Sequence, residues 1–309
     1  MSFEAHARIG LAIRSAAPPG PAAGFRRPGH AGKPRRTTGP TPVCYPERGD
    51  QLMELGISGR NAFVCASTGG LGEATARALA AEGVNVVVSG RRGDRARAIA
   101  AELPGAVGIE VDLTAPDGAD QLLAAATSAL GDIDILVLNG PGPRPATASV
   151  LTIDDTTQAV HNLLLVHQRL VAGVLPGMRE RGWGRVLAIG SSGVVAPIPR
   201  LALSNIGRSA LAAYLKGLAA EVAADGVTAN LLLPGRIATD RVASLDTAQA
   251  EREQRTPEEV RASTEAAIPA GRYGDPTEFG AAAAFLCSAK ASYITGTAIR
   301  CDGGMVATL

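Results

Sequence analysis

Short apolar segments alternate with helical segments from Asn61 to the end of the chain. Seven runs are largely apolar, which is typical of strands covered on both faces, and Ala- and Leu-rich stretches with helical spacing lie between them. The expected strands are residues 62–66, 84–89, 106–111, 134–139, 185–190, 227–233 and 297–302. The expected helices are residues 72–82, 93–102, 116–130, 153–181, 204–225 and 276–288.

This alternation predicts one α/β domain over residues 53–309. Strands that alternate with helices form a parallel sheet, and right-handed crossovers place helices on both of its faces. We therefore expect a Rossmann-type, doubly wound parallel sheet in a three-layer α/β/α arrangement. Residues 237–270, helical in pattern and highly charged, are expected to form a lid over the substrate.

The first 52 residues differ in composition from the rest of the chain. They hold eight Pro and seven Gly and show no periodic apolar pattern, so we expect disorder. Their arginines resemble those of a transit peptide, but the prolines interrupt any amphipathic helix. Two interpretations stay open: a genuine N-terminal tail, or a misassigned start with Met53 as the first residue of the protein.

Composition excludes several classes of function. Residues 53–309 carry a net charge of −4, against +5 for residues 1–52, so a nucleic-acid partner is not expected. The chain has no apolar run of the roughly 18 residues that span a membrane, and we expect a cytoplasmic protein with a small-molecule substrate. The cysteines and histidines show no metal or disulfide spacing, and His161 and His167 are expected to be packed side chains.

A glycine cluster follows the first expected strand. Gly69, Gly70 and Gly72 lie directly before an Ala-rich helix. Glycines at this place allow a tight turn and close approach to a pyrophosphate, which the helix N-terminus then faces. The simpler interpretation is a loop that only requires positive φ angles.

The second expected strand ends in two arginines, Arg91 and Arg92, where a dinucleotide fold usually places an acid on the adenine ribose. Two guanidinium groups suit a 2′-phosphate, which favours NADP(H), although both could also be solvated loop residues. Asp112 could meet the adenine edge, and Asn139 and Gly140 could line the floor below the ribose. All of these positions follow strand ends, so they converge on one crevice.

These motifs, in this order, resemble those of the short-chain dehydrogenase/reductase family over residues 54–309. The matching segments are "STGGLG" at 67–72, "DL" at 112–113, "LNGP" at 138–141, "HNL" at 161–163, "IGSS" at 189–192, "LPGRIAT" at 233–239 and "YITGTAIRCDGG" at 293–304. The resemblance implies a catalytic serine at Ser191 and a catalytic-shell asparagine at Asn162. It also implies cofactor contacts at Ser67, Leu71, Leu113, Pro234, Gly235, Ile237 and Thr239.

The sequence departs from the family where the chemistry is done. The family's Tyr-x-x-x-Lys pair falls on Ser204 and Arg208, since Ser204 lies thirteen residues after Ser191. The first glycine of the family motif falls on Ala66. An aliphatic alcohol is a far weaker acid than a phenol, and a guanidinium stays protonated at working pH, so the pair cannot copy the Tyr–Lys mechanism.

Three alternatives follow for this pair. Ser204 could relay a proton from a water held by Asn162, or Ser191 and Ser204 could clamp an oxyanion beside the charge of Arg208. In the third, hydride chemistry is lost and the pocket polarises a substrate for another reaction. The simplest interpretation is structural: Ser204 as a helix N-cap, and Arg208 bonded to the cofactor ribose or to solvent.

The sequence thus predicts an NADP(H)-dependent oxidoreductase acting on a carbonyl or secondary alcohol. The resemblance points to 3-oxoacyl-carrier-protein reductases and to an oxoacyl- or polyketide-like substrate. The alternatives are a non-redox isomerase, cyclase or dehydratase, and a cofactor-binding protein without catalysis. Apolar faces on helices 153–181 and 204–225 predict a homodimer or homotetramer. Pro197, Ile198, Pro199 and Leu201 are expected to form an apolar pocket wall.

Overall fold

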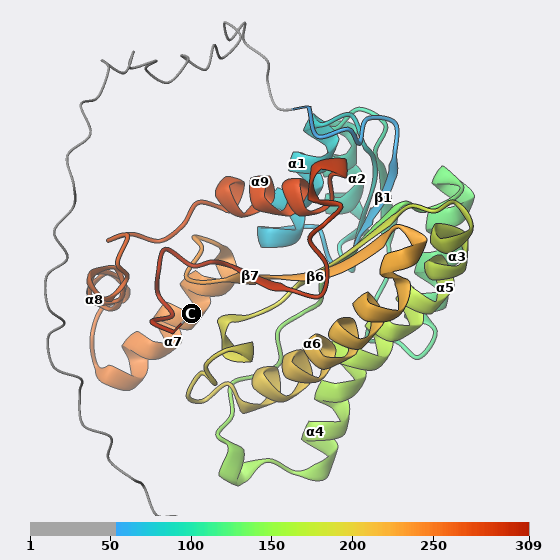
Figure 1. Cartoon of the computed structure of the whole chain (residues 1–309). Helices are drawn as coiled ribbons and strands as arrows, with labels where there is room; N and C mark the ends of the chain where they lie inside the picture. The colour runs from blue at the N-terminus through green and yellow to red at the C-terminus, as the bar shows by residue number, and fades with distance from the viewer. Residues whose placement is uncertain (1–53, 309) are drawn as a thin grey trace, which may run out of the picture. The chain divides into compact units, whose positions relative to one another are not determined.

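A computed structural model of the chain describes residues 54–308, so the predicted tail lies outside the described residues. Seven parallel strands form one sheet in the order β3-β2-β1-β4-β5-β6-β7 (Figure 1). The predicted doubly wound parallel sheet is confirmed. The strands are β1 Asn61–Val64, β2 Asn85–Gly90, β3 Val107–Glu110, β4 Ile135–Leu138, β5 Gly184–Ile189, β6 Val227–Pro234 and β7 Ala298–Cys301.

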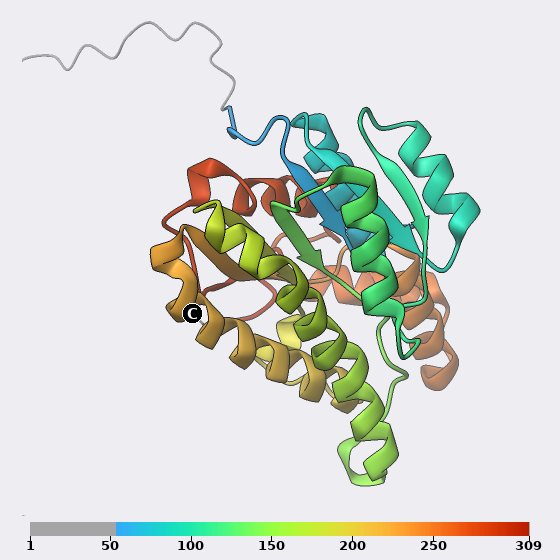
Figure 2. The same cartoon turned by 90° about the vertical axis from the view of Figure 1, so that its right-hand side faces the viewer.

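Helices cover both faces of the sheet, and each face has its own apolar core (Figures 1 and 2). Successive strand residues point to opposite faces, so Phe63 packs with α3, α5 and α6, whereas Val64 packs with α1, α2 and α9. These helices are α1 Gly70–Ala81, α2 Gly93–Ala101, α3 Gly118–Leu130, α5 Val166–Glu180, α6 Ala202–Val222 and α9 Pro276–Leu286. The three expected layers are therefore present.

The expected helix at 153–181 is interrupted. It consists of α4 Ile153–Val160, a π-helical turn His161–Leu165, and α5. A capping box between Thr152 and Asp155 fixes the start of α4. Because a π turn contains an extra residue, it changes the register of the residues that follow, and such turns are frequent at functional sites.

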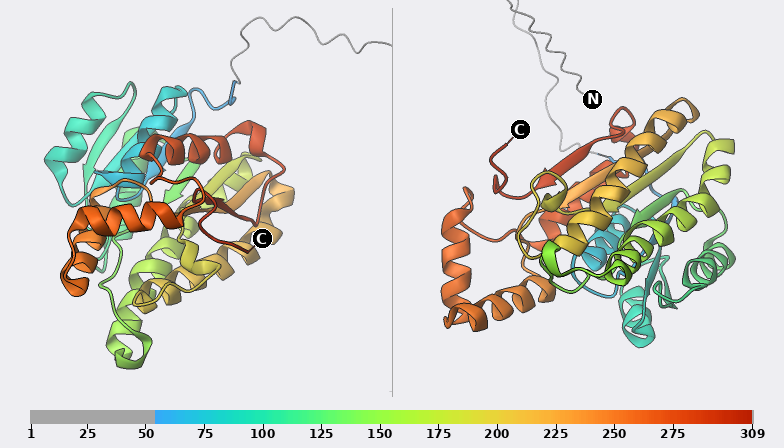
Figure 3. Two further views of the ribbon diagram at one scale, coloured as in Figure 1. Left: turned by 90° about the vertical axis from the view of Figure 1, so that its left-hand side faces the viewer. Right: turned by 90° about the horizontal axis from the view of Figure 1, so that it is seen from below.

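The segment predicted to act as a lid is helical and contains α7 Asp240–Glu253 and α8 Pro257–Ala267, which protrude from the body in orange (Figure 3). The chain turns between them at Gln254, which adopts a left-handed conformation with φ 52°. At the base of the lid, the buried carboxylate of Asp246 accepts hydrogen bonds from Arg236 at 3.0 Å and from the Tyr273 hydroxyl at 2.9 Å. These contacts anchor α7 to the segment that enters α9.

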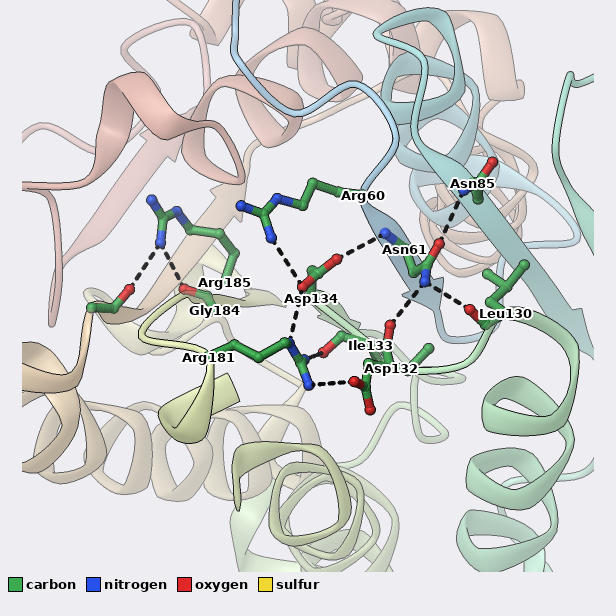
Figure 4. Close-up of polar contacts among 11 residues, drawn as sticks. Arg60, Asn61, Asn85, Leu130, Asp132, Ile133, Asp134, Arg181, Gly184 and Arg185 are labelled. Carbon is green, nitrogen blue, oxygen red and sulfur yellow. Dashed lines mark hydrogen bonds and ion pairs between the residues drawn. The ribbon is translucent and has the colours of Figure 1, made fainter. Parts of the chain in front are cut away.

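A polar network lies at the amino end of the strands, opposite the end that carries the predicted site (Figure 4). The carboxylate of Asp134 accepts from Arg60 at 3.3 Å and pairs with Arg181 at 3.5 Å. The guanidinium groups of Arg60 and Arg185 stack on the ring of Trp183, at 4.1 and 4.4 Å from its centre. The network joins the first residues of β1, β4 and β5.

The described residues were also searched for membrane-spanning helices and for disulfides. Between residues 54 and 308, no helix is both long enough and apolar enough to cross a membrane. Cys65, Cys287 and Cys301 are free thiols. Burial raises the pKa of Cys65 and of Cys287 to about 12, so both stay protonated at neutral pH.

Candidate active site

A cleft of about 740 Å³ runs along the carboxyl ends of the strands. It crosses the point between β1 and β4 where the strand order reverses, which is the usual ligand position in open α/β sheets. The loops that follow β1 to β6 all contribute to its walls. Predicted site residues in its lining are Gly69, Gly70, Leu71, Arg91, Arg92, Asp112, Leu113, Asn139, Gly140, Ser191, Ser204, Arg208, Pro234, Gly235, Ile237 and Thr239.

The glycine loop is built for close backbone approach. A Cβ at Gly72 would lie 2.6 Å from the Ala66 carbonyl oxygen, so only glycine lets α1 pack this tightly. Gly70 has φ 56°, and Ala66, at the family's first glycine, has φ 46°. The Asn139 side chain donates to the Ala66 carbonyl at 3.1 Å and thereby ties this loop to the end of β4.

Ser67 and Gly72 lie behind the cleft wall. The Ser67 hydroxyl donates to the Val64 carbonyl at 2.7 Å and accepts from the Ser89 amide at 2.9 Å. Ser67 is fully buried, so its side chain joins β1 to β2 instead of facing a ligand. These two predicted cofactor residues therefore support the loop from within.

The two arginines after β2 differ in their surroundings. Arg92 donates to the Thr68 carbonyl at 2.6 Å and lies over Gly69. Arg91 makes no hydrogen bond or ion pair with any residue from 54 to 308. Hydrogen bonds from Thr114, with a smaller contribution from the charge of Arg91, lower the pKa of Asp112. Arg91 is thus the freer of the two cations on this wall.

The serines reach the cleft from two elements. Ser191 directly follows β5, and its Oγ accepts from the Gly193 amide at 3.1 Å. Ser204 is the third residue of α6, which begins at Ala202 with no side-chain cap. The N-cap interpretation of Ser204 is therefore wrong, because the helix starts two residues earlier.

Arg208 lies one turn further along α6 and is 9% exposed. Its Nη1 donates to the Ile189 carbonyl at 2.6 Å. Burial, with a smaller contribution from the charge of Arg241, lowers its pKa to about 10, so it remains a cation at neutral pH. The interpretation of Arg208 as a solvated side chain is wrong, because the side chain sits between α6 and the end of β5.

Asn162 belongs to the π turn and is not among the cleft-lining residues. Its side-chain oxygen accepts from Gln158 at 2.9 Å. Its backbone carbonyl oxygen lies 3.9 Å from the Cβ position of Gly140, which does line the cleft. Asn162 therefore approaches the cleft floor through its main chain.

Sequence reasoning treated His167 only as a packed residue, and the structure places it directly below the cleft floor. Nε2 lies 3.6 Å from the Cβ position of Gly140, and Nδ1 lies 3.1 Å from the Leu163 carbonyl oxygen. Burial lowers the pKa of His167 to about 4, and the charge of Arg208 adds to this effect. His167 is therefore neutral at physiological pH.

Arg241 is a second residue that the sequence did not single out. It is the second residue of the lid helix α7, lines the cleft, and donates to the Pro143 carbonyl at 3.1 Å. This contact reaches from the loop after β6 to the loop after β4. The sequence indicated only that residues 237–270 are highly charged.

A parallel sheet with a glycine loop after β1 and a cleft at the switch point defines the Rossmann-type, dinucleotide-binding class of α/β proteins. A family model named enoyl-(acyl carrier protein) reductase matches residues 65–306. The chain belongs to the short-chain dehydrogenase/reductase family.

Two curated relatives illustrate the match. The 3-oxoacyl-(acyl-carrier-protein) reductase of Vibrio cholerae is 32% identical over 81% of this chain and 99% of its own length. Dehydrogenase/reductase SDR family member 4 of Sus scrofa is 33% identical over 82% of this chain and 89% of its own length.

Solved structures agree in fold. L-Sorbose reductase from Gluconobacter frateurii, solved with NADPH and L-sorbose, superposes with a TM-score of 0.78 at 30% identity, over 83% of this chain and all of that one. Actinorhodin polyketide ketoreductase, solved with NADPH, superposes with a TM-score of 0.75 at 29% identity, over 80% of this chain and 97% of that one.

Proposed function

We propose that this protein is an NADPH-dependent reductase of a small carbonyl compound, with an oxoacyl- or polyketide-like substrate. The observation that carries this proposal is the continuity of the cleft. One cavity joins the glycine loop and Arg91 to Ser191, Ser204 and Arg208. Related reductases in this family support the reaction type.

The residues present fit a dinucleotide. Gly70 and the N-terminus of α1 would face the pyrophosphate, and a Cβ at Gly70 would lie 3.6 Å from Thr239 on the opposite wall. Arg91 and Arg92 would hold the 2′-phosphate. NADPH, when bound, supplies the hydride; the chain's own residues supply the orientation and the proton.

Ser191 and Ser204 are proposed to donate hydrogen bonds to the substrate oxygen as negative charge develops on it. Two preorganised donors stabilise an oxyanion, and each is typically worth about 3 kcal/mol. Arg208 places a fixed positive charge one helical turn away and does not itself release a proton at neutral pH. The proton then reaches the oxygen through a serine hydroxyl in contact with water.

The test is NADPH oxidation with a panel of 3-oxoacyl thioesters, 3-oxo acids and cyclic ketones. With a reduced substrate found, Ser204→Ala should lower kcat/KM by about one to three orders of magnitude, while NADPH affinity stays unchanged. Ser209→Ala, an exposed serine on the same helix, is the matched control. Unchanged turnover in Ser204→Ala would remove Ser204 from the chemistry.

A non-redox reaction is the second candidate, and the replacement of the family's Tyr–Lys pair by Ser204 and Arg208 favours it. An isomerase, cyclase or dehydratase needs a polarised carbonyl but no phenolic proton donor. The double variant Ser204→Tyr with Arg208→Lys discriminates between the two. A gain of ketone reduction indicates a weakened reductase. A loss of a native non-redox activity, with or without new reduction, indicates the second candidate.

Cofactor preference tests the phosphate site separately. NADPH should bind at least about tenfold more tightly than NADH, or about 1.4 kcal/mol. Arg91→Ala should remove most of the preference for NADPH over NADH. Arg91 makes no hydrogen bond or ion pair within residues 54–308, so its guanidinium is available for the 2′-phosphate. Arg95→Ala, on α2 and paired with Glu73, is the control. Equal affinities in the unmodified protein would reject the assignment of NADP(H).

We also propose a homodimer or homotetramer. Ile153 on α4, Leu165 in the π turn and Ile206 on α6 are 82%, 46% and 37% exposed. Apolar side chains that lie on neighbouring helices gain from burial against a second subunit. Light scattering at micromolar concentration should give a multiple of the 31.4 kDa chain mass; a monomer mass would refute the proposal.

A further inference from the structure

We propose that the substrate is a free oxo acid, and that Arg208 and Arg241 bind its carboxylate from two walls of the cleft. The inference rests on the proposed function, because it places the carboxylate beside the carbonyl that Ser191 and Ser204 would receive. The substrate would then be a short-chain acid with a free carboxylate, not a carrier-bound thioester.

Arg208 carries a buried charge with no acidic partner among the described residues. A guanidinium has five N–H donors, and Arg208 uses Nη1 for a single carbonyl, that of Ile189. A buried cation is costly unless it is paired and hydrogen-bonded. Since Arg208 also lines the cleft, a ligand carboxylate could take up its remaining donors in a bidentate pair.

Arg241, on the lid helix α7, supplies a second cation to the cleft lining. It lies over Gly142, whose Cβ position is 3.1 Å from Nη2, and it makes its one hydrogen bond within residues 54–308 to the Pro143 carbonyl. Both side chains line the cleft, and the charge of Arg241 contributes to the lowered pKa of Arg208, so the two cations repel each other. An anion between them would convert this repulsion into two attractions.

The other charged residues of the cleft form no ion pair with Arg208 or Arg241, so both guanidinium groups can bind a ligand anion. Arg236 lines the same cleft but is committed to the buried carboxylate of Asp246 at 3.0 Å. Asp112 lies after β3, at the far end of the cleft from α6. Asp240 is exposed at the start of α7 and is the one acid near the pair among the lining residues. The substrate end therefore has a surplus of positive charge.

The remaining wall defines the rest of the ligand. Ile198, Leu201, Leu245 and Met305 line the same cleft as the two cations. Nη1 of Arg208 bonds the Ile189 carbonyl, two residues before Ser191, so a carboxylate on Arg208 would place a carbonyl one to two carbons away beside the cleft serines. A 2- or 3-oxo acid with a short apolar chain fits these requirements.

The test measures binding instead of turnover, and it compares a carboxylate with its neutral ester. Calorimetric titration of the NADP⁺-saturated protein would use hexanoate and methyl hexanoate as probes. Hexanoate should bind at least tenfold more tightly, about 1.4 kcal/mol. Arg241→Gln, on the exposed lid, should lower hexanoate affinity at least tenfold and leave the ester unchanged. Arg208→Gln should act in the same direction, and Arg169→Gln, paired with Asp120 on the surface, should change neither probe.

Two outcomes would overturn the inference. One is equal binding of acid and ester. The other is an Arg241→Gln variant that loses NADP⁺ affinity at an unchanged acid-to-ester ratio, which would assign Arg241 to the cofactor pyrophosphate. Reduction of 3-oxohexanoate and of its methyl ester separates this inference from the proposed function. Acid-selective binding without any reduction rejects only the reductase; reduction of the ester in preference to the acid rejects only the carboxylate site.

Discussion

The two ends of the sheet use buried arginines in opposite ways. At the amino end, Arg185 is 2% exposed, donates to the carbonyls of Ser288, Gly184 and Gly226 at 3.0, 2.8 and 3.2 Å, and stacks on Trp183. At the carboxyl end, Arg208 is 9% exposed and donates to one carbonyl. Desolvation lowers the pKa of both. Arg185 thus donates to three carbonyls of the protein, whereas Arg208 uses one of its five N–H donors within residues 54–308.

The backbone shows the same contrast. Each of the seven strands is preceded by a glycine with positive φ, such as Gly226 before β6, where a Cβ would lie 2.1 Å from the Gly182 carbonyl oxygen. Among the described non-glycine residues with positive φ, Ala66 and Arg200 lie in the loops after β1 and β5, and Gln254 lies between α7 and α8. The turns before the strands therefore use glycine, whereas Ala66 and Arg200 in the loops after β1 and β5 adopt the left-handed conformation with a side chain.

The largest expected effect is on stability, from Arg185→Met. The change leaves three carbonyl groups unpaired in the interior, and each unpaired group costs about 1–3 kcal/mol, so we expect a loss of about 3–5 kcal/mol. Removing the desolvated charge offsets part of this cost. Chemical denaturation would measure the loss, with unchanged NADPH affinity in the folded protein.

The matched control for this variant is Arg169→Met, which removes an exposed ion pair with Asp120 and should leave the denaturation midpoint nearly unchanged. A small effect of Arg185→Met would contradict the view that the amino end is the structural end of the sheet.

The second prediction concerns the loss of stability at acidic pH, which we attribute to His167 at the carboxyl end of the sheet. His167 has a pKa of about 4 in the folded protein, against 6.5 when unperturbed. The unfolded chain therefore binds more protons between these values. The stability contribution is complete above pH 6.5 and is lost as the pH falls to 4, at about 1.4 kcal/mol per unit, or about 3 kcal/mol in all.

His167→Gln should flatten this part of the pH dependence, because glutamine has no proton to gain. Denaturation midpoints measured from pH 7 to pH 4.5 in both proteins provide the comparison, with His161→Gln as the control. If the slopes of the His167 variant and the unmodified protein coincide, the acid sensitivity originates elsewhere.

The sequence was sufficient to predict the sheet but not the details of its two ends. Continuous apolar runs mark buried parallel strands, so all seven strands were predicted to within a few residues. The glycine loop and the convergence of strand ends follow from the same topology. The network of Arg60, Trp183 and Arg185 could not be predicted, because it joins residues that are distant in sequence by tertiary packing alone.

The site was predictable in position and less so in role. The spacing from Ser191 placed Ser204 and Arg208 in the cleft lining, but nothing local indicated that α6 begins before Ser204. His167 lies on an apolar stripe, where a packed histidine and one beneath an active site look alike. Arg241 reaches Pro143 across 98 positions, and no local pattern reports such a contact.

The third prediction is that Arg208→Met reverses the balance found for Arg185→Met. Only one carbonyl, that of Ile189, loses its partner, so we expect a stability loss of about 1–2 kcal/mol, reduced by relief of the buried charge. Turnover should fall at least about tenfold, or 1.4 kcal/mol in transition-state energy. Denaturation and steady-state kinetics on one preparation would measure both. A stability loss equal to that of Arg185→Met, with turnover intact, would erase the distinction between the two ends.

The smallest expected effect belongs to Ala66→Gly, which restores glycine at a strained position after β1. A left-handed conformation costs an L-residue roughly 1–2 kcal/mol, and glycine avoids this cost. Glycine also gains more freedom in the unfolded chain, worth about 0.5–1 kcal/mol against the folded state. The net change should be a stabilisation of at most about 1 kcal/mol, measured by denaturation. Gly226→Ala at the amino end is the converse variant and should destabilise strongly, because its Cβ would meet the Gly182 carbonyl. If Ala66→Gly is clearly destabilising, the methyl group of Ala66 contributes packing that outweighs the strain, and the carboxyl end is less strained than its φ angle implies.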